Sequence, residues 1–173
     1  MKQLLIGCGQ NITKKLSLGA EDPVWDDLTT LDINPNMNPD IVWDLNKTPY
    51  SFAEDNTFDE IHAYEVLEHL GTLGDYKTFF TQFEELWRIL KPDGLLLGTA
   101  PAIISPWLFG DPGHTRVISN ESLTFLSQSA YSQIEKGSPM SDYRYLYKGN
   151  FGLIYQQTNG IIYIFVLKAL KGA

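Results

Sequence analysis

The residues with the clearest chemical potential lie in the first 32 positions of the chain. The apolar run 4–6 predicts a short strand, and the turn Gly7-Cys8-Gly9 follows it at once. Glycines at this point let the backbone approach a ligand closely, because no Cβ stands in the way. A second apolar run, 28–31, ends in Asp32. An acid at the carboxyl end of a second parallel strand can bind both hydroxyls of a ribose, so the pattern predicts a nucleoside-containing ligand.

Two features limit the interpretation of this turn. The strict dinucleotide-binding pattern requires a third glycine, and Ile12 stands in its place. Cys8 would act as a nucleophile only with a lowered pKa and a partner base. We therefore interpret Cys8 as a small, half-buried residue between the two glycines.

A second group of reactive side chains follows a predicted strand over 58–64. Glu65 stands at its carboxyl end, and His69 follows four residues later, so both would share one face of a short helical turn over 66–70. The pair has the chemistry of metal ligands, but no third ligand stands at a recognisable spacing, so we expect no metal. His69 is instead expected to cap the short helix or to face a cleft.

The loop 111–116 brings acidic, imidazole and guanidinium groups together. His114 has the chemistry of a general base near neutral pH. Arg116 has the geometry to hold a carboxylate or a phosphate. Trp107 and Phe109 come just before this loop and suit a lid over a bound molecule. A structural alternative stands beside each expectation, since the loop could be held by its own hydrogen bonds and the aromatic rings could simply pack.

Composition bounds the class of protein. The chain has 173 residues, 43% of them apolar and 13% aromatic, which predicts one packed domain over 1–173. Its net charge of −8 argues against nucleic acid as the partner, because nucleic-acid binders usually present a basic face. The single cysteine, Cys8, cannot form an internal disulfide and fits a reducing cytoplasm. The longest apolar run, 161–167, is too short to span a bilayer, so no membrane association is expected.

The elements that must position these residues alternate between strands and helices. Apolar runs predict strands over 4–6, 28–32, 40–43, 58–64 and 95–100. The clearest helix covers 76–90 after the N-cap Asp75, and a second covers 120–129 after the N-cap Ser119. Only one or two helical turns are expected over 12–16, and Pro35 and Pro39 argue against a helix between them. The segment Lys91-Pro92-Asp93-Gly94 predicts a turn.

The end of the chain has a different character. The segments 143–157 and 161–170 are rich in strand-forming residues, and Asn159-Gly160 lies between them. Asn-Gly between two such segments is the strongest short signal for a hairpin. We therefore predict an α/β fold whose sheet is parallel through five strands and ends in an antiparallel hairpin.

This layout resembles the class I S-adenosylmethionine-dependent methyltransferases, and in particular small, type 11-like members in which a brief loop replaces the first helix. The resemblance covers nearly the whole chain. The segments that carry it, in chain order, are 5–9, 31–35, 44–45, 55–61, 65–70 and 88–94. It implies a three-layer, Rossmann-like fold with a seven-stranded mixed sheet and a C-terminal antiparallel hairpin. The chain departs from the family in the missing acid before Gly7, where Leu4 and Leu5 stand.

The resemblance also implies roles for individual residues. S-adenosylmethionine would be the cofactor, with the ribose on Asp32 and the adenine beside Asp44 and Leu45. The residues expected to bind it are Gly7, Cys8, Gly9, Asp32, Ile33, Asp44, Leu45, Tyr64 and Glu65. The acceptor pocket would follow the fifth strand, with Trp107, His114 and Arg116 binding the acceptor and His114 and His69 in catalytic roles. Asp44 could instead form an Asx turn before Asn46, and Tyr64 could belong to the core.

The expected activity is methyl transfer to a small-molecule acceptor. The methyl carbon of a sulfonium is already electrophilic, so the protein mainly has to align the acceptor and exclude water. Glu65-Val66-Leu67 stands where an Asn-Pro-Pro-Tyr-like motif would indicate methylation of an adenine or glutamine amino group. A non-catalytic binding module and an NAD(P)-dependent oxidoreductase remain as alternatives, the latter disfavoured by Ile12. A homodimer through the edge hairpin is a further possibility.

Overall fold

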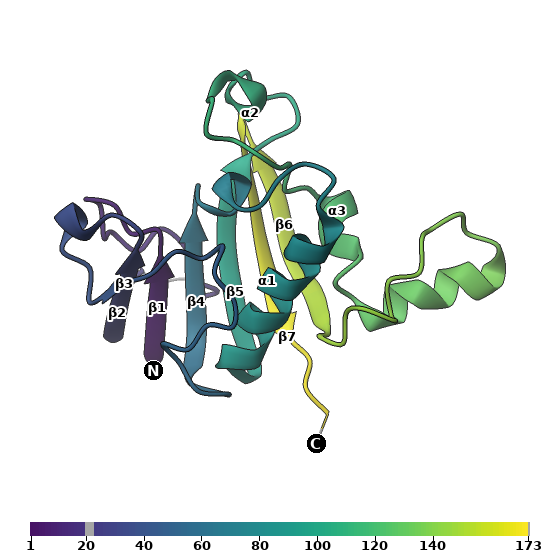
Figure 1. Cartoon of the computed structure of the whole chain (residues 1–173), viewed down its shortest axis with the longest axis horizontal. Helices are drawn as coiled ribbons and strands as arrows, with labels where there is room; N and C mark the ends of the chain where they lie inside the picture. The colour runs from purple at the N-terminus through teal and green to yellow at the C-terminus, as the bar shows by residue number, and fades with distance from the viewer. Residues whose placement is uncertain (20–22, 173) are drawn as a thin grey trace.

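The computed structural model describes residues 1–19 and 23–172, and within these ranges the chain forms one seven-stranded sheet (Figure 1). The strands are β1 (Lys2–Ile6), β2 (Asp27–Asp32), β3 (Ile41–Val42), β4 (Phe58–Tyr64), β5 (Leu90–Pro101), β6 (Phe151–Asn159) and β7 (Ile162–Ala169). The α-helices are α1 (Tyr76–Ile89), α2 (Trp107–Gly110) and α3 (Asn120–Thr124), and the 3-10 helices are η1 (Pro35–Met37), η2 (Leu67–His69) and η3 (Gln128–Lys136).

The order of the strands is β3-β2-β1-β4-β5-β7-β6. The first five strands of this order pair in parallel, β7 pairs antiparallel with β5, and β6 completes an antiparallel hairpin with β7. The predicted α/β fold with its inserted antiparallel strand is therefore confirmed. From β1 the chain continues outward to β2 and β3, and it then returns to place β4 and β5 on the other side of β1. The strand order therefore changes direction between β1 and β4, and α/β proteins bind ligands at the carboxyl ends of the strands at such a point.

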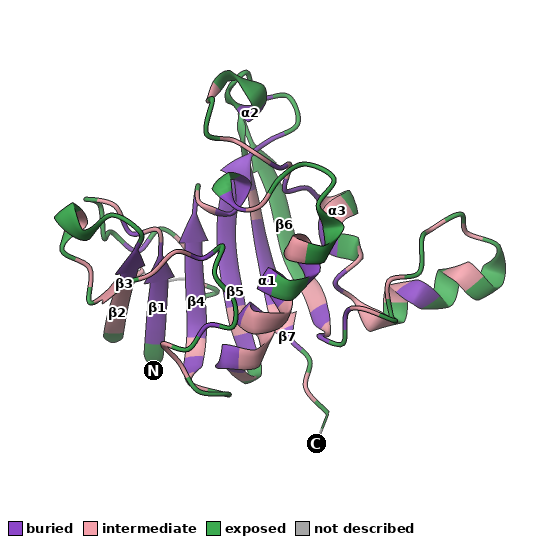
Figure 2. Ribbon diagram, in the orientation of Figure 1, coloured by how far each residue is buried: buried purple, intermediate pink, exposed green. Residues whose placement is uncertain are grey.

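The larger core lies between the sheet and α1. Successive residues of β1 point to opposite faces, and Leu4 and Ile6 join the core under α1. The helix contributes one apolar face, of which Phe80, Phe83 and Leu86 are almost fully buried. Burial of each such side chain is worth about 1.5–3 kcal/mol, so this face fixes α1 against the sheet. Figure 2 shows the central strands as the most deeply buried part of the molecule.

A smaller apolar cluster lies on the opposite face of the sheet. Leu5, Cys8 and Tyr64 form it, and the partly buried Leu16 and Trp25 pack against it. This face is therefore covered by the loop that follows the glycine turn, in the place where a doubly wound fold has helices. The third layer of the fold is thin at this point.

The expectation of helical turns over 12–16 is wrong, and the reason lies in the backbone donors. The Asn11 side chain accepts a hydrogen bond from the N–H of Thr13 at 2.9 Å, which competes with a helical turn. The hydroxyl of Tyr64 accepts hydrogen bonds from the N–H groups of Lys15 and Leu16, both at 3.2 Å. These donors are thus satisfied by a side chain of β4, and the segment adopts no helix.

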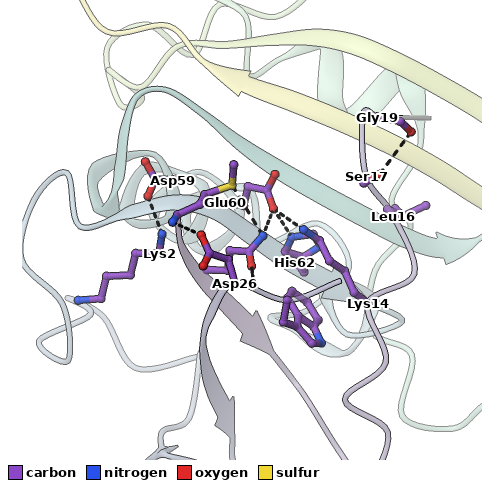
Figure 3. A network of polar contacts seen from close by, with 12 residues as sticks. Lys2, Lys14, Leu16, Ser17, Gly19, Asp26, Asp59, Glu60 and His62 are labelled. Carbon is purple, nitrogen blue, oxygen red and sulfur yellow. Dashed lines mark hydrogen bonds and ion pairs between the residues drawn. The ribbon is translucent and has the colours of Figure 1, made fainter. Parts of the chain in front are cut away.

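A buried polar network fastens the same segment to the sheet (Figure 3). Glu60 Oε2 accepts hydrogen bonds from Gln3, from Lys14 at 3.0 Å, and from His62 at 2.9 Å. Burial opposes ionisation of Glu60, but the hydrogen bonds from His62, Lys14 and Gln3 prevail and lower its pKa to about 2. Burial lowers the pKa of His62, so its imidazole is neutral and Lys14 supplies the opposite charge.

Other boundaries differ from the sequence expectations for local reasons. Pro35 begins the 3-10 helix η1, because its fixed φ suits a first helical position and Asn34 caps the turn. The predicted turn at 91–94 lies inside the long strand β5. The predicted helix over 120–129 ends at Thr124, although Ser119 caps it through a capping box. The hairpin begins at Phe151, so 143–150 is not a strand.

None of the helices in the described ranges has the length and apolar character needed to cross a membrane.

Candidate active site

Two clefts meet at the carboxyl edge of the sheet. The first has a volume of about 380 Å³ and includes Gly7, Asp32, Ile33, Trp43, Asp44, Leu45, Glu65 and His69 in its lining. The second has a volume of about 330 Å³ and includes Glu65, His69, Pro101, Ser105, Trp107, Asp111 and His114. We call them the first and the second cleft. Because Glu65 and His69 line both, the two clefts adjoin at these residues.

Of the two glycines in the turn, Gly7 lines the first cleft and Gly9 does not. Gly7 and Gly9 have φ values of 61° and 52°, a left-handed conformation that favours glycine. A Cβ at Gly7 would collide with the side chain of Val66, which follows β4. The turn therefore owes its close contact with the neighbouring strand to the absence of a side chain at Gly7.

Asp32 holds the glycine turn and still has acceptor capacity. Its side chain is buried, with Oδ2 accepting the N–H of Gly9 at 2.9 Å and Oδ1 accepting the N–H of Asn34 at 2.8 Å. An ionised carboxylate has about four lone-pair sites, so about two remain for hydroxyl groups of a ligand in the cleft. The Cys8 N–H donates to the carbonyl oxygen of Leu31 at 3.1 Å and adds a second tie between turn and strand.

Asp44 and Leu45 belong to the lining of the first cleft. Asp44 Oδ1 accepts the N–H of Asn46 at 2.9 Å, which is the Asx turn foreseen as an alternative. Both residues also line the cleft, so the Asx turn orients Asp44 while this residue remains part of the lining. The carbonyl oxygen of Leu45 accepts hydrogen bonds from Tyr50 and Gln82, and these fix this wall against α1.

Cys8 and Tyr64 are placed behind the turn. Both belong to the smaller apolar cluster on the opposite face of the sheet, and neither lines the first cleft. Burial raises the pKa of the Cys8 thiol, which is the opposite of what a nucleophile requires. Burial also raises the pKa of Tyr64 to about 12, and its hydroxyl bonds His62 at 2.6 Å. These side chains support the turn from the rear.

The junction of the clefts is built on a strained residue and a short helix. Glu65 has a φ of 54°, rare for a residue with a side chain and typical of positions whose geometry serves a site. Its N–H donates to Thr99 of β5 at 3.0 Å, which fixes the exit of β4. The 3-10 helix η2 follows and presents His69, whose Nδ1 lies 3.1 Å from the carbonyl oxygen of Gly113.

Glu68 and His114 lie close to His69 at this junction, and no pattern in the sequence singles out Glu68. Its side chain is fully buried, and neither carboxylate oxygen has a hydrogen-bond partner among the described residues. Burial, with the nearby charges of Glu65 and Asp111, raises the pKa of Glu68 to about 8. His114 Nε2 lies 4.0 Å from Glu68 Oε1, and the rings of His69 and His114 meet edge to face at 4.6 Å.

Arg116 is not brought to this cluster. Its guanidinium is buried, donates to Gln82 Oε1 at 2.7 Å and lies 5.5 Å from the ring centre of Phe79. Burial lowers its pKa to about 10. It lines a separate, largely apolar cavity of about 320 Å³ beside α1. The expected pairing of Arg116 with His114 on one acceptor is therefore not assembled.

Trp107 and the loop after it contribute to the lining of the second cleft. Trp107 belongs to α2, is 60% exposed and lines the cleft with His114. Phe109, on the same helix, is 76% exposed and does not line it. The N–H groups of Thr115 and Arg116 both donate to the carbonyl oxygen of Glu68, at 2.8 and 3.2 Å. The loop is thus held by hydrogen bonds to η2, and this brings His114 to the cleft.

The sheet order and the paired clefts define a protein of the class I S-adenosylmethionine-dependent methyltransferase fold. A model of a family described as a methyltransferase domain matches residues 4–98, more than half of the chain. The chain belongs to this family, and the resemblance seen in the sequence is confirmed. The matched segment includes the first cleft and ends before the loop that carries His114.

Solved structures with the same fold share little sequence with this chain. A methyltransferase from Archaeoglobus fulgidus is 17% identical with a TM-score of 0.58, and the match covers 96% of this chain and 86% of that one. The N-methyltransferase NodS from Bradyrhizobium japonicum, in complex with S-adenosylhomocysteine, is 16% identical with a TM-score of 0.57, covering 98% and 78%. A putative methyltransferase of Haloferax volcanii, bound to the activator Trm112, is 13% identical with a TM-score of 0.57, covering 98% and 83%. No curated protein matches the chain.

Proposed function

We propose that this chain is an enzyme that transfers a methyl group from S-adenosylmethionine to a small-molecule acceptor. The observation that carries the proposal is the carboxylate of Asp32, held by two backbone N–H groups beside a glycine turn with acceptor capacity left over. It lines a cleft that adjoins a second cleft at Glu65 and His69. Family membership and the complex of NodS with S-adenosylhomocysteine support the choice of cofactor.

In this proposal, different residues of the first cleft bind different parts of the cofactor. Asp32 accepts the two ribose hydroxyls, Asp44 and Leu45 flank the adenine, and the turn at Gly7 approaches the methionine portion. Glu65 lines both clefts and lies where they adjoin. When bound, the cofactor supplies an electrophilic methyl group, and the chain has to place an acceptor in line with it.

The second cleft is proposed to hold the acceptor. His69 and His114 line it, and so does Trp107 of α2. The exposed indole is well placed to exclude water once an acceptor is bound, which is the main task of the protein in this reaction. A cleft of about 330 Å³ suits a small molecule, and the net charge of −8 disfavours nucleic acid.

A comparison of ligands tests the proposal. S-adenosylhomocysteine and NADH are titrated separately into the protein by calorimetry. The proposal expects binding of S-adenosylhomocysteine at a Kd of about 1 μM, equivalent to about −8 kcal/mol, and much weaker binding of NADH. Preference for NADH would favour an oxidoreductase. Binding of S-adenosylhomocysteine without turnover of any acceptor would favour a non-catalytic module that retains the fold.

Location and assembly are the remaining parts of the proposal. The lone, buried Cys8 is compatible with a reducing cytoplasm, where we place the protein.

The hairpin strand β6 forms an edge of the sheet and exposes Ile154 and Tyr155. Such an edge can pair with a second copy of the chain, so we propose a homodimer through β6. Light scattering of the protein in solution tests this directly.

A further inference from the structure

We propose that Glu68, His69 and His114 bind one divalent transition-metal ion at the junction of the two clefts. The sequence offers no third ligand at a recognisable spacing from Glu65 and His69. The fold supplies one, because the loop 111–116 folds onto η2 and brings His114 against His69. The metal site stands on its own geometry, whereas its role in acceptor binding rests on the proposed function.

The separation of the donor atoms fits a shared ion. One ligand atom from each of the three side chains lies within 4.8 Å of the other two, and His114 Nε2 is 4.0 Å from Glu68 Oε1. Donors bound at about 2.1 Å to one tetrahedral zinc are about 3.4 Å apart. The observed separations of up to 4.8 Å exceed that spacing by at most about 1.4 Å, so the ligand atoms need only small shifts to share one ion.

The state of Glu68 points to a missing partner. A fully buried carboxylate without a hydrogen bond costs several kcal/mol if it is ionised, and buried charges in proteins are normally paired or bound to a metal. Both of its oxygens are in this condition, and they lie next to two imidazoles. A cation among these groups would satisfy the carboxylate, which no described residue does.

In a metal-binding histidine, the ring nitrogen that does not bind the metal usually donates a hydrogen bond to a carbonyl oxygen or a carboxylate. His69 has such a contact. Its Nδ1 donates to the carbonyl oxygen of Gly113 at 3.1 Å, which leaves Nε2 with its lone pair free for a metal. A Cβ at Gly113 would lie 3.0 Å from Nδ1 of His69, so glycine at this position permits the close contact. The same loop carries His114, so one contact orients both imidazoles.

The donor set selects the class of metal. Two imidazoles and one carboxylate suit zinc, manganese or iron, whereas magnesium and calcium prefer ligands that are all oxygen. Three protein ligands leave coordination positions open, as in catalytic sites, and His69 and His114 line the second cleft. An acceptor that offers a hydroxyl or carboxylate oxygen would fill an open position. The two histidines then act as ligands and not as free bases.

Calorimetric titration of zinc chloride into the metal-free, untagged protein tests the proposal. We expect about one ion per chain with a Kd of about 1 μM or tighter. Glu68→Gln keeps the shape of the side chain and removes a ligand charge, and His114→Ala removes an imidazole. Each is expected to weaken binding by at least about 100-fold. Glu54→Gln, an exposed acid, and Cys8→Ala, the only thiol, are the matched controls and should bind as the wild type does.

A second readout separates loss of the metal from loss of the fold. Zinc at about 100 times its Kd should stabilise the wild type by about 2.7 kcal/mol against unfolding, and Glu68→Gln should fold normally but lose this effect. No zinc binding by the wild type, or equal binding by Glu68→Gln and His114→Ala, would overturn the proposal. Titration of S-adenosylhomocysteine in the presence of EDTA reports on the proposed function alone, so the two failures are distinguishable.

Discussion

Replacement of Lys14 by methionine would test how the loop behind the glycine turn is held. Lys14 is 8% exposed, and its ammonium lies 3.0 Å from Glu60 Oε2. Methionine fills nearly the same space without the charge or the donor. Glu60 would then keep Gln3 and the neutral imidazole of His62, and it would face no buried cation from the described residues.

The structure sets the size of the effect. The fall in the pKa of Glu60 from 4.5 to about 2 corresponds to about 3 kcal/mol, which is the contribution of all of its partners less the cost of burial. Removing one partner of a buried ion pair costs about 3–5 kcal/mol when the other is left alone, and Glu60 retains two donors. We therefore expect Lys14→Met to lower the free energy of unfolding by about 2 kcal/mol at pH 7. For a domain of this size the melting temperature would fall by about 4–8 °C.

The effect has a defined pH dependence. The pKa of Glu60 is lower in the folded than in the unfolded chain, so its stabilisation is complete above the unfolded value. It is lost as the pH falls from about 4.5 towards 2. Because the stabilising charge interaction needs an ionised Glu60, the difference between wild type and Lys14→Met should shrink over the same interval.

Urea denaturation at pH 7 and at successive lower values measures this difference. Lys77→Met, an exposed lysine on α1, is the matched control and should change stability by less than about 0.5 kcal/mol. A loss below about 0.5 kcal/mol for Lys14→Met at pH 7, or a loss that does not vary with pH, would show that the network does not hold the loop as described.

Four further substitutions probe other parts of the molecule. Gly9→Ala should cost about 1 kcal/mol for its positive φ, whereas Gly7→Ala should cost about 3 kcal/mol or more and weaken S-adenosylhomocysteine binding, because only Gly7 meets Val66. Denaturation and calorimetry compare the two. Trp107→Ala should reduce turnover and leave S-adenosylhomocysteine affinity unchanged, as a kinetic and calorimetric comparison will show. Ser119→Ala removes a capping box and should lower the free energy of unfolding by about 1 kcal/mol in urea.

The parts of the fold that could be predicted from the sequence depend on local patterns. The helix over 76–89 follows from its 3.6-residue apolar period, and strand 58–64 and the hairpin follow from composition and an Asn-Gly turn. The residues 12–16 do not by themselves show that this segment has no helical turn, because the hydroxyl that binds its backbone belongs to Tyr64, far along the chain. A local pattern does not show that contact.

The residues of the candidate site show the same difference between local patterns and contacts that are distant in the sequence. Gly7, Asp32, Asp44 and Leu45 line one cleft as the order of the segments indicated, since the carboxyl ends of parallel strands meet at one edge. The grouping of Glu68 with His114 depends on how a loop closes over η2, which spacing does not encode. Arg116 lies two positions after His114, yet it turns to α1 and bonds Gln82 there.

Calorimetric titration of S-adenosylhomocysteine, with wild type and Asp32→Asn measured side by side, tests whether the first cleft binds the cofactor through Asp32. We expect binding at a Kd of about 1 μM for the wild type. Two hydrogen bonds to a charged group are worth about 3–6 kcal/mol, so Asp32→Asn should bind at least about 100-fold more weakly. Asp26→Asn, an exposed acid at the opposite edge of the sheet, should bind as the wild type does. A wild type that does not bind, or an Asp32→Asn variant that binds equally well, would contradict the account.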